Sequence, residues 1–102
     1  MRIVLTTCPL KDVEKIRDGV FDAKLVACVL DIPMNESKFW WKGKVGSEKE
    51  NLLIFKTRKD LVDKLFRRIK ELHPYGVPFI AEIDVEKVNE EYEKWLNEVT
   101  TK

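Results

Sequence analysis

Four short apolar runs, separated by polar and turn-forming residues, have the length and composition of β-strands. The first is RIVLT at residues 2–6, and Pro9 is expected to end it. The other three runs are LVACVLDI at 25–32, NLLIFK at 51–56 and VPFIAEID at 77–84. The runs at 25–32 and 51–54 are apolar on both faces, which is typical of strands covered on both sides.

Between and after these strands, apolar residues recur at the spacing of amphipathic helices. The first helix is expected to begin at Asp12, and the second is expected to be capped by Thr57. The second ends before His73-Pro74, because the residue before a proline avoids the helical conformation. A third, shorter helix opens at Asn89. The apolar stripes are Val13, Ile16, Val20 and Ala23; then Leu61, Leu65, Ile69 and Leu72, with Phe66 beside them; then Tyr92, Trp95, Leu96 and Val99.

The stretch SKFWWKGKV at residues 37–45 places three aromatic residues in a row, Phe39, Trp40 and Trp41. It is expected to be a strand or the arm of a long hairpin, with its turn at Gly46 and Ser47. Neighbouring side chains of a strand point to opposite faces, so Trp40 faces one way and Phe39 and Trp41 face the other.

The order of elements, βαββαβ followed by a helix, predicts an α+β fold. With right-handed crossovers it suits a ferredoxin-like sandwich, in which two helices cover one face of an antiparallel sheet. The length fits one domain spanning residues 1–102.

The second face of that sheet would be open, although its strands are apolar on both faces. An exposed apolar patch usually marks a partner surface, so we expect identical chains to supply the cover. The alternative is a monomer in which Trp40 and Trp41 are ordinary core and rim residues.

The composition narrows the class of function. The formal net charge is only +1, which argues against a sequence-independent nucleic-acid binder. No apolar run approaches the length of a membrane span, and the N-terminal run lacks the apolar core of a signal peptide, so we expect a cytoplasmic protein. Charged residues make up 36% of the chain and glutamine is absent, a pattern typical of thermostable proteins.

Few residues are candidates for catalysis or metal binding. Cys8 and Cys28 are expected to be free thiols, since they fall near opposite edges of the predicted sheet. The single histidine, His73, is either a helix cap or a metal ligand, because imidazole and thiolate suit ions such as copper. No catalytic motif is present, and Lys56 at a strand end is more typical of a solvated lysine than of a catalytic one, so we expect no enzyme.

Several separate motifs resemble the CutA divalent-cation tolerance family, in order and spacing over almost the whole chain. They are LVACV at 25–29, KFWWKGKV at 38–45, LLIFKTRKD at 52–60, KELHPYGVP at 70–78 and NEEYEKWLNE at 89–98. The resemblance implies a ferredoxin-like homotrimer whose long hairpins clasp adjacent subunits, with Phe39, Trp40 and Trp41 in the trimer interface. It also implies a cytoplasmic protein linked to divalent-metal tolerance that binds copper(II) or a similar cation, with no organic cofactor.

Carried over residue by residue, the resemblance implies metal contacts at His73 and Cys28, and a cleft between subunits near Lys56, Thr57 and Tyr75. Many members of the family have glutamate directly after the equivalent of Pro78, whereas this chain has Phe79. That difference removes one possible carboxylate ligand.

Three hypotheses follow. The first is a homotrimeric metal-tolerance protein. The second is a trimer similar to the PII-type signalling proteins, with Lys56 and Arg58 at the mouth of a cleft for a small anion or nucleotide. The third, an RNA-binding ferredoxin-like domain, is disfavoured because the RNP1 pattern is missing.

Overall fold

The computed structural model describes residues 1–100 as a four-stranded antiparallel sheet backed by two helices. The strand order is β2-β5-β1-β6, and β3 and β4 form a separate two-stranded ribbon. The elements are β1 Arg2–Pro9, the 3₁₀ turn η1 Leu10–Asp12, α1 Val13–Phe21, β2 Cys28–Pro33, β3 Ser37–Trp41, β4 Lys44–Glu48, β5 Glu50–Thr57, the 3₁₀ turn η2 Lys59–Leu61, α2 Val62–Leu72, β6 Ile80–Asp84 and α3 Glu90–Val99. The predicted ferredoxin-like sandwich, its hairpin and its extra helix are confirmed.

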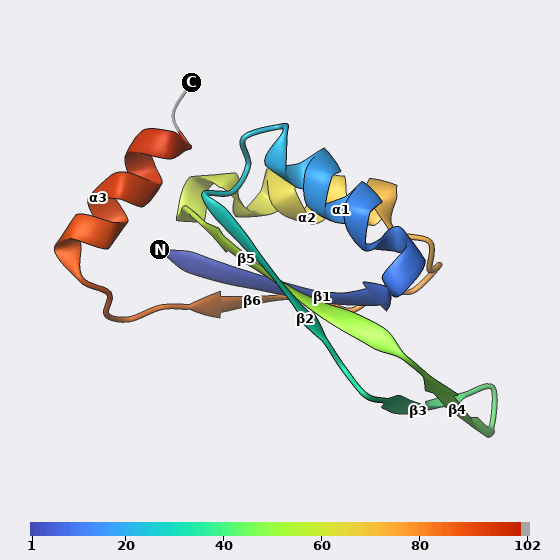
Figure 1. Ribbon diagram of the computed structural model, residues 1–102. Helices are drawn as coiled ribbons and strands as arrows, with labels where there is room; N and C mark the ends of the chain where they lie inside the picture. Colours follow the sequence, from blue (N-terminus) through green and yellow to red (C-terminus); the bar gives the residue numbers. More distant parts are fainter. Residues whose placement is uncertain (101–102) are drawn as a thin grey trace.

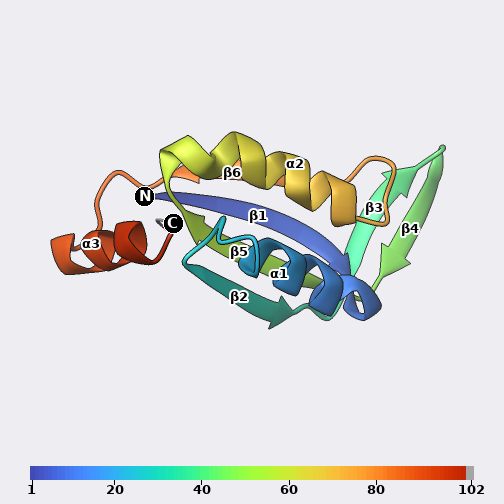
Figure 2. The same ribbon diagram turned by 90° about the horizontal axis from the view of Figure 1, so that it is seen from above.

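The β3–β4 hairpin and α3 lie at opposite ends of an elongated molecule. Both views show α1 and α2 side by side on one face of the sheet, with the hairpin reaching out beyond one end (Figures 1 and 2). The greatest extent of the molecule is 46 Å, compared with 25 and 21 Å across it.

The core lies between the helices and the sheet. Val4 and Phe55 from the central strands and Ile16 and Leu65 from the helices are fully buried there. The sequence pattern predicted this layer correctly, because residues at i and i+2 of a strand and at i, i+3 and i+4 of a helix share one face.

The other face of the sheet is apolar and, apart from the end where Tyr92 of α3 meets Lys56, is left largely uncovered by residues 1–100. One row of paired residues crosses all four strands as Leu30, Ile54, Leu5 and Ala81. Leu30 keeps 39% of its surface exposed, and Ile32 and Ile83 keep 42% and 47%. The predicted open apolar face is therefore present.

The hairpin turns earlier than predicted. Lys42 and Gly43, with φ of 51° and 77°, form the turn, whereas Gly46 and Ser47 lie inside β4. Two consecutive left-handed residues give the twist that two-residue hairpin loops require. Gly46 has a packing role instead: it pairs with Phe39, whose ring lies so close that a Cβ at Gly46 would meet it at 2.5 Å.

The expected helix caps also differ. Asp12 and Asn89 occupy the N-cap positions of α1 and α3, but neither side chain makes a capping hydrogen bond. Thr57 does not cap, because η2 intervenes before α2 and the Thr57 hydroxyl donates to the Leu25 carbonyl at 2.6 Å. The strands predicted at 25–32 and 77–84 begin later, at Cys28 and Ile80.

Candidate functional site

His73 is held from both sides in the segment that follows α2. Its Nε2 lies 2.8 Å from the Thr7 carbonyl oxygen, and its Nδ1 lies 3.2 Å from the backbone N–H of Tyr75. A backbone N–H can only donate, so Nδ1 accepts and Nε2 carries the proton. His73 is 8% exposed, and it fixes the loop by binding one group on each ring nitrogen.

Tyr75 connects this loop to two carboxyl groups. Its hydroxyl lies 2.9 Å from Oε2 of Glu50 and 3.4 Å from Oε2 of Glu48. Burial, the hydrogen bond to Glu50 and the negative charges of Glu50 and Glu48 raise the pKa of the Tyr75 hydroxyl well above its usual range. The phenol therefore remains a proton donor at any ordinary pH.

The loop and the hairpin line an open hollow of about 580 Å³, which we call the hairpin hollow. All three predicted aromatic residues, Phe39, Trp40 and Trp41, line it. The remaining lining residues are Thr7, Ser37, Glu48, Glu50, Pro74, Tyr75, Gly76, Val77 and Phe79. We call this region, together with His73, the hairpin end.

The opposite end of β5 carries a positive charge. The Lys56 ammonium group lies 3.1 Å from the Tyr92 hydroxyl and 5.0 Å from the centre of the Tyr92 ring. The hydrogen bond to Tyr92 raises the pKa of Lys56, which keeps the lysine charged. Cys28 is the partner of Lys56 in the sheet register, so the two predicted residues lie side by side.

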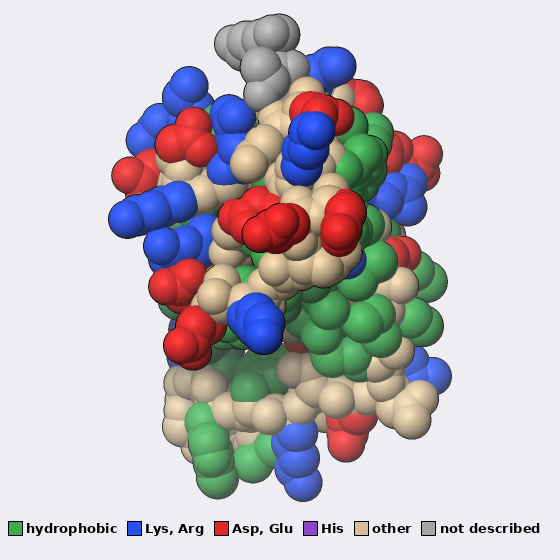
Figure 3. Space-filling view, turned by 90° about the vertical axis from the view of Figure 1, so that its left-hand side faces the viewer, with side chains coloured by type: hydrophobic (Ala, Val, Ile, Leu, Met, Phe, Trp, Pro, Cys, Tyr) green, Lys and Arg blue, Asp and Glu red, His purple; other side chains and the backbone are tan. Residues whose placement is uncertain are grey.

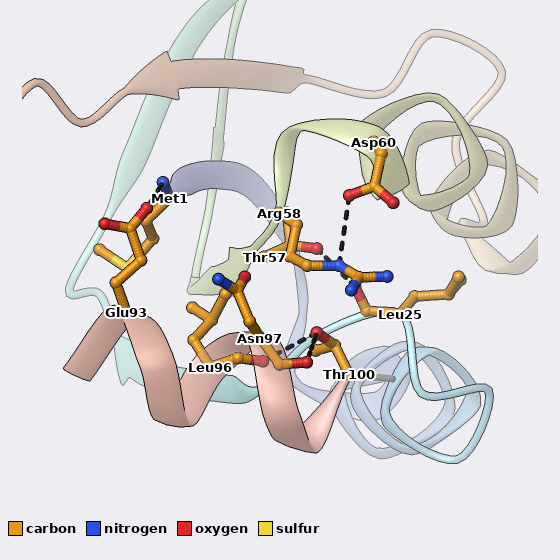
Figure 4. A network of polar contacts seen from close by, with 9 residues as sticks. All are labelled: Met1, Leu25, Thr57, Arg58, Asp60, Glu93, Leu96, Asn97 and Thr100. Atoms are coloured by element: carbon orange, nitrogen blue, oxygen red, sulfur yellow. Dashed lines mark hydrogen bonds and ion pairs between the residues drawn. The ribbon is translucent and has the colours of Figure 1, made fainter. Parts of the chain in front are cut away.

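A further polar contact joins α3 to the N-terminus at this end, which we call the helix end: the amino group of Met1 forms an ion pair with Glu93 at 3.1 Å (Figure 4). Nearby, Arg58 pairs with Asp60 at 3.2 Å, just before α2. The Thr100 hydroxyl donates to the Leu96 carbonyl at 2.8 Å and closes the last turn of α3. The surface of this end mixes acidic and basic side chains beside an area of hydrophobic ones (Figure 3).

The structure thus divides the predicted site residues between two places. His73, Tyr75 and the aromatic trio are at the hairpin end, whereas Cys28, Lys56 and Thr57 are at the helix end. Within residues 1–100, no group of three or more His, Cys, Asp or Glu side chains could hold a metal ion. One chain therefore does not supply a complete metal site from His73 and Cys28.

The two thiols are free, as predicted. Cys8 pairs with Asn51 at one end of β5 and Cys28 pairs with Lys56 at the other, which explains why they form no disulfide. Burial, followed by the negative charges of Asp12, Asp31 and Glu50, raises the pKa of the buried Cys8 thiol to about 11.

Sequence reasoning missed Glu48, Glu50 and Tyr92 as members of these clusters. Glu50 looked like any other surface carboxylate of a charge-rich chain, yet only 5% of it is exposed. No local pattern marks it, because the residues that bury it arrive from the loop after α2. Tyr92 was expected on the apolar stripe of the third helix, and its hydroxyl contact depends on where that helix docks.

Fold and site together define the class: a ferredoxin-like fold with a projecting aromatic hairpin and a C-terminal helix packed at the end of the sheet. A family model described as "CutA1 divalent ion tolerance protein" matches residues 2–99. The chain belongs to this family.

Individual relatives agree over the whole length. The divalent-cation tolerance protein CutA of Pyrococcus horikoshii is 47% identical, with all of both chains covered. The crystal structure of CutA1 from the same organism superposes with a TM-score of 0.93 at 46% identity, again over all of both chains. The structure titled "PII-like protein CutA from Nostoc sp. PCC 7120 in apo form" gives a TM-score of 0.93 at 35% identity, covering 99% of this chain and 98% of that one.

The relatives differ in where they are described to reside. A structure from Archaeoglobus fulgidus, 32% identical with a TM-score of 0.93 over 99% of this chain and all of that one, is titled a periplasmic divalent cation tolerance protein. Within the described part of the chain, no helix is long and apolar enough to cross a membrane.

Proposed function

We propose that the protein is a cytoplasmic homotrimer that contributes to divalent-metal tolerance by binding copper(II) or a similar cation, without catalysing a reaction. The observation that supports the proposed trimer is the exposed apolar face of the sheet. Its apolar row crosses all four strands, and Leu30, Ile32 and Ile83 each expose more than a third of their surface. A soluble protein with such a surface is stabilised by covering it, and copies of the same chain offer the same surface in return.

Metal binding is proposed to use donors from more than one chain. His73 and Cys28 lie at opposite ends of the sheet, so only neighbouring copies bring one of each together. A metal bound to His73 would have to replace one of its two existing contacts. The 3.2 Å contact from Tyr75 N–H to Nδ1 is the longer, so Nδ1 is the atom we assign to the metal.

Native mass spectrometry of the purified chain, with and without copper(II), tests both parts. A trimer that takes up a fixed, saturable number of copper ions per chain is the expected result. Cys28→Ala is expected to reduce the uptake, whereas Cys8→Ala is the matched control, because the Cys8 thiol is buried and protonated. A monomer, or a trimer with equal copper uptake in both variants and in His73→Ala, would contradict the assignment.

A second candidate is a PII-like trimer that binds a small anion or nucleotide in a cleft between chains. The supporting observation is Lys56. Its ammonium group donates one hydrogen bond to the Tyr92 hydroxyl, and its other two N–H groups can donate to a ligand. Thr57 supports this candidate less, because its hydroxyl group already donates a hydrogen bond to the Leu25 carbonyl. A thermal-shift screen of nucleotides and organic acids is the test, and no shift with any of them would count against this candidate.

A further inference from the structure

The imidazole of His73 is oriented by the fold in the way that a metal ligand requires. The backbone N–H of His73 donates to the Ile69 carbonyl at 2.9 Å, and its Nε2–H donates to the Thr7 carbonyl at 2.8 Å. A histidine that binds a metal through one ring nitrogen usually donates the other N–H to a carbonyl or carboxylate, which fixes the ring and its tautomer. His73 therefore fits a metal site, with Nδ1 as the nitrogen that carries the lone pair.

Tyr75 occupies that lone pair. Its backbone N–H donates to Nδ1 of His73 at 3.2 Å, and the two rings pack with their centres 4.9 Å apart. Because Nδ1 has one lone pair, a cation and the Tyr75 N–H cannot both use it. Any cation that binds His73 through Nδ1 must therefore displace the backbone of Tyr75.

The Tyr75 hydroxyl fastens the other end of the same residue. It donates to Oε2 of Glu50 at 2.9 Å, and Glu50 is 5% exposed. A buried carboxylate that loses this donor loses a charge-assisted hydrogen bond and has little water to replace it. Moving the Tyr75 backbone away from Nδ1 therefore disturbs the contact with Glu50.

None of these contacts needs the hairpin end to face solvent. They join groups of one chain, and both His73 and Glu50 are buried within it. A neighbouring chain can cover the hairpin end and supply Cys28, as proposed above, without removing them.

We propose that Tyr75 is a positioning residue that lowers the affinity of His73 for divalent cations, through its hydroxyl contact with Glu50. This inference rests on the proposed metal function and concerns the regulation of that site. The contact holds the turn after α2 against Nδ1, and the free energy needed to disturb it is subtracted from that of cation binding. By thermodynamic linkage, a variant that lacks the contact binds the cation more tightly.

Tyr75→Phe is the direct test, because it removes the hydroxyl and keeps the backbone N–H that donates to Nδ1. Copper(II) affinity of the untagged, full-length protein in its native assembly is measured by competition with a chromophoric chelator. We expect Tyr75→Phe to bind copper(II) about tenfold more tightly than the wild type. Unchanged or weaker binding would overturn the proposal.

Glu50→Ala breaks the same contact from the opposite side and keeps the test decisive if Tyr75→Phe does not assemble. Its reference is Glu48→Ala, which makes the same charge change at a carboxylate that lies 3.4 Å from the Tyr75 hydroxyl. We expect Glu50→Ala to bind copper(II) more tightly than Glu48→Ala, and equal affinities would contradict the proposal. Native mass spectrometry checks the subunit count of each variant.

Thr6→Val is the matched control for general loosening of the segment after α2. The Thr6 hydroxyl donates to the Phe79 carbonyl at 2.7 Å, so this variant removes a hydroxyl contact to the same segment without changing Tyr75. Its copper(II) affinity should equal that of the wild type. Equal tightening in Thr6→Val and Tyr75→Phe would overturn the proposal, since loosening of the whole segment would explain both.

A spectroscopic signature separates this inference from the proposed function. His73 is the only histidine of the chain, so ¹⁵N-labelled histidine reports on it alone. Replacing ¹⁴N by ¹⁵N changes the nitrogen hyperfine pattern in the electron paramagnetic resonance spectrum of bound copper(II) only if His73 is a ligand. No change in the wild type or in Tyr75→Phe would overturn both proposals. A change in both proteins with equal copper(II) affinities would overturn only the role of Tyr75.

Discussion

The two ends of β5 place opposite charges in contrasting surroundings. At the helix end, Lys56 has a partner in Tyr92, Met1 has one in Glu93, and α3 is fastened over both. At the hairpin end, Glu48 and Glu50 share one hydroxyl proton beside an open, aromatic cavity. Groups whose hydrogen bonds and charges are satisfied stabilise the fold. At the hairpin end the nearly buried Glu50 depends on the Tyr75 hydroxyl, whereas the exposed Glu48 is accessible to water.

This contrast also shows which candidate residues already use their hydrogen bonds within the fold. Within one chain, the Thr57 hydroxyl donates to the Leu25 carbonyl and Lys56 donates to Tyr92, while their place in a cleft between subunits stays a prediction. Both ring nitrogens of His73 also form hydrogen bonds within the fold. Glu48 and Glu50, which both approach the Tyr75 hydroxyl, are members of the hairpin-end cluster that sequence reasoning did not single out.

The largest expected effect is at the helix end. Leu96→Ala removes a side chain that is 1% exposed, so it should lower the free energy of unfolding by about 3 kcal/mol. Val99→Ala on the same helix is the control, because Val99 is 38% exposed and should cost less than about 1 kcal/mol. Denaturant unfolding at fixed chain concentration measures both. Equal losses would mean that α3 is not fastened through Leu96.

A pair of tyrosine variants compares the two ends directly. Tyr75→Phe leaves the nearly buried Glu50 without its donor and should cost about 2 kcal/mol. Tyr92→Phe removes an acceptor from Lys56, whose ammonium group can turn to water, and should cost about 0.5 kcal/mol. The same unfolding measurement applies. A larger loss in Tyr92→Phe would reverse the comparison.

Alkaline pH should destabilise the protein through the buried Cys8 thiol. The pKa of Cys8 is raised from its ordinary value of 9.0 to about 11 in the folded protein, so the folded state holds a proton that the unfolded state has lost. Well below pH 9 this thiol does not change the free energy of unfolding. As pH rises from 9 to 11, the free energy of unfolding falls, because the unfolded state loses the proton first.

The measurement is the unfolding free energy against pH in the wild type and in Cys8→Ala. The unfolding free energy of the variant should fall less than that of the wild type over that interval, by about 2 kcal/mol. Parallel curves for wild type and Cys8→Ala would show that the Cys8 thiol does not titrate differently on folding.

The smallest expected effect concerns the ion pair between the Met1 amino group and Glu93. Glu93→Gln should lower stability by about 0.5 kcal/mol at low salt, since the glutamate is 45% exposed and water screens the pair. The difference from the wild type should disappear at high salt. A loss that persists at high salt would indicate a packing role for Glu93.

Much of the fold was predictable, because its signals are local. Val13, Ile16 and Val20 repeat at helical spacing and are buried as expected, and His73-Pro74 ends α2. The turn at Lys42-Gly43 was misplaced because Gly46 is also a turn-forming residue, and only the approach of the Phe39 ring reveals its packing role. The site was less predictable. Its aromatic residues are conspicuous in the sequence, but the burial of Glu50 depends on a loop more than twenty residues away.

The sequence by itself determined the order of strands and helices, the core face of each and the presence of an apolar face that the helices leave open, because these properties follow from the periodicity of the chain. Only the tertiary structure decided which polar groups are satisfied. Strand pairing set Cys28 beside Lys56 and far from His73, and the return of the chain after α2 brought Tyr75 to Glu50. The physical reason is that a hydrogen bond or a buried charge depends on distances of a few ångströms between residues remote in sequence, and no local pattern encodes those distances.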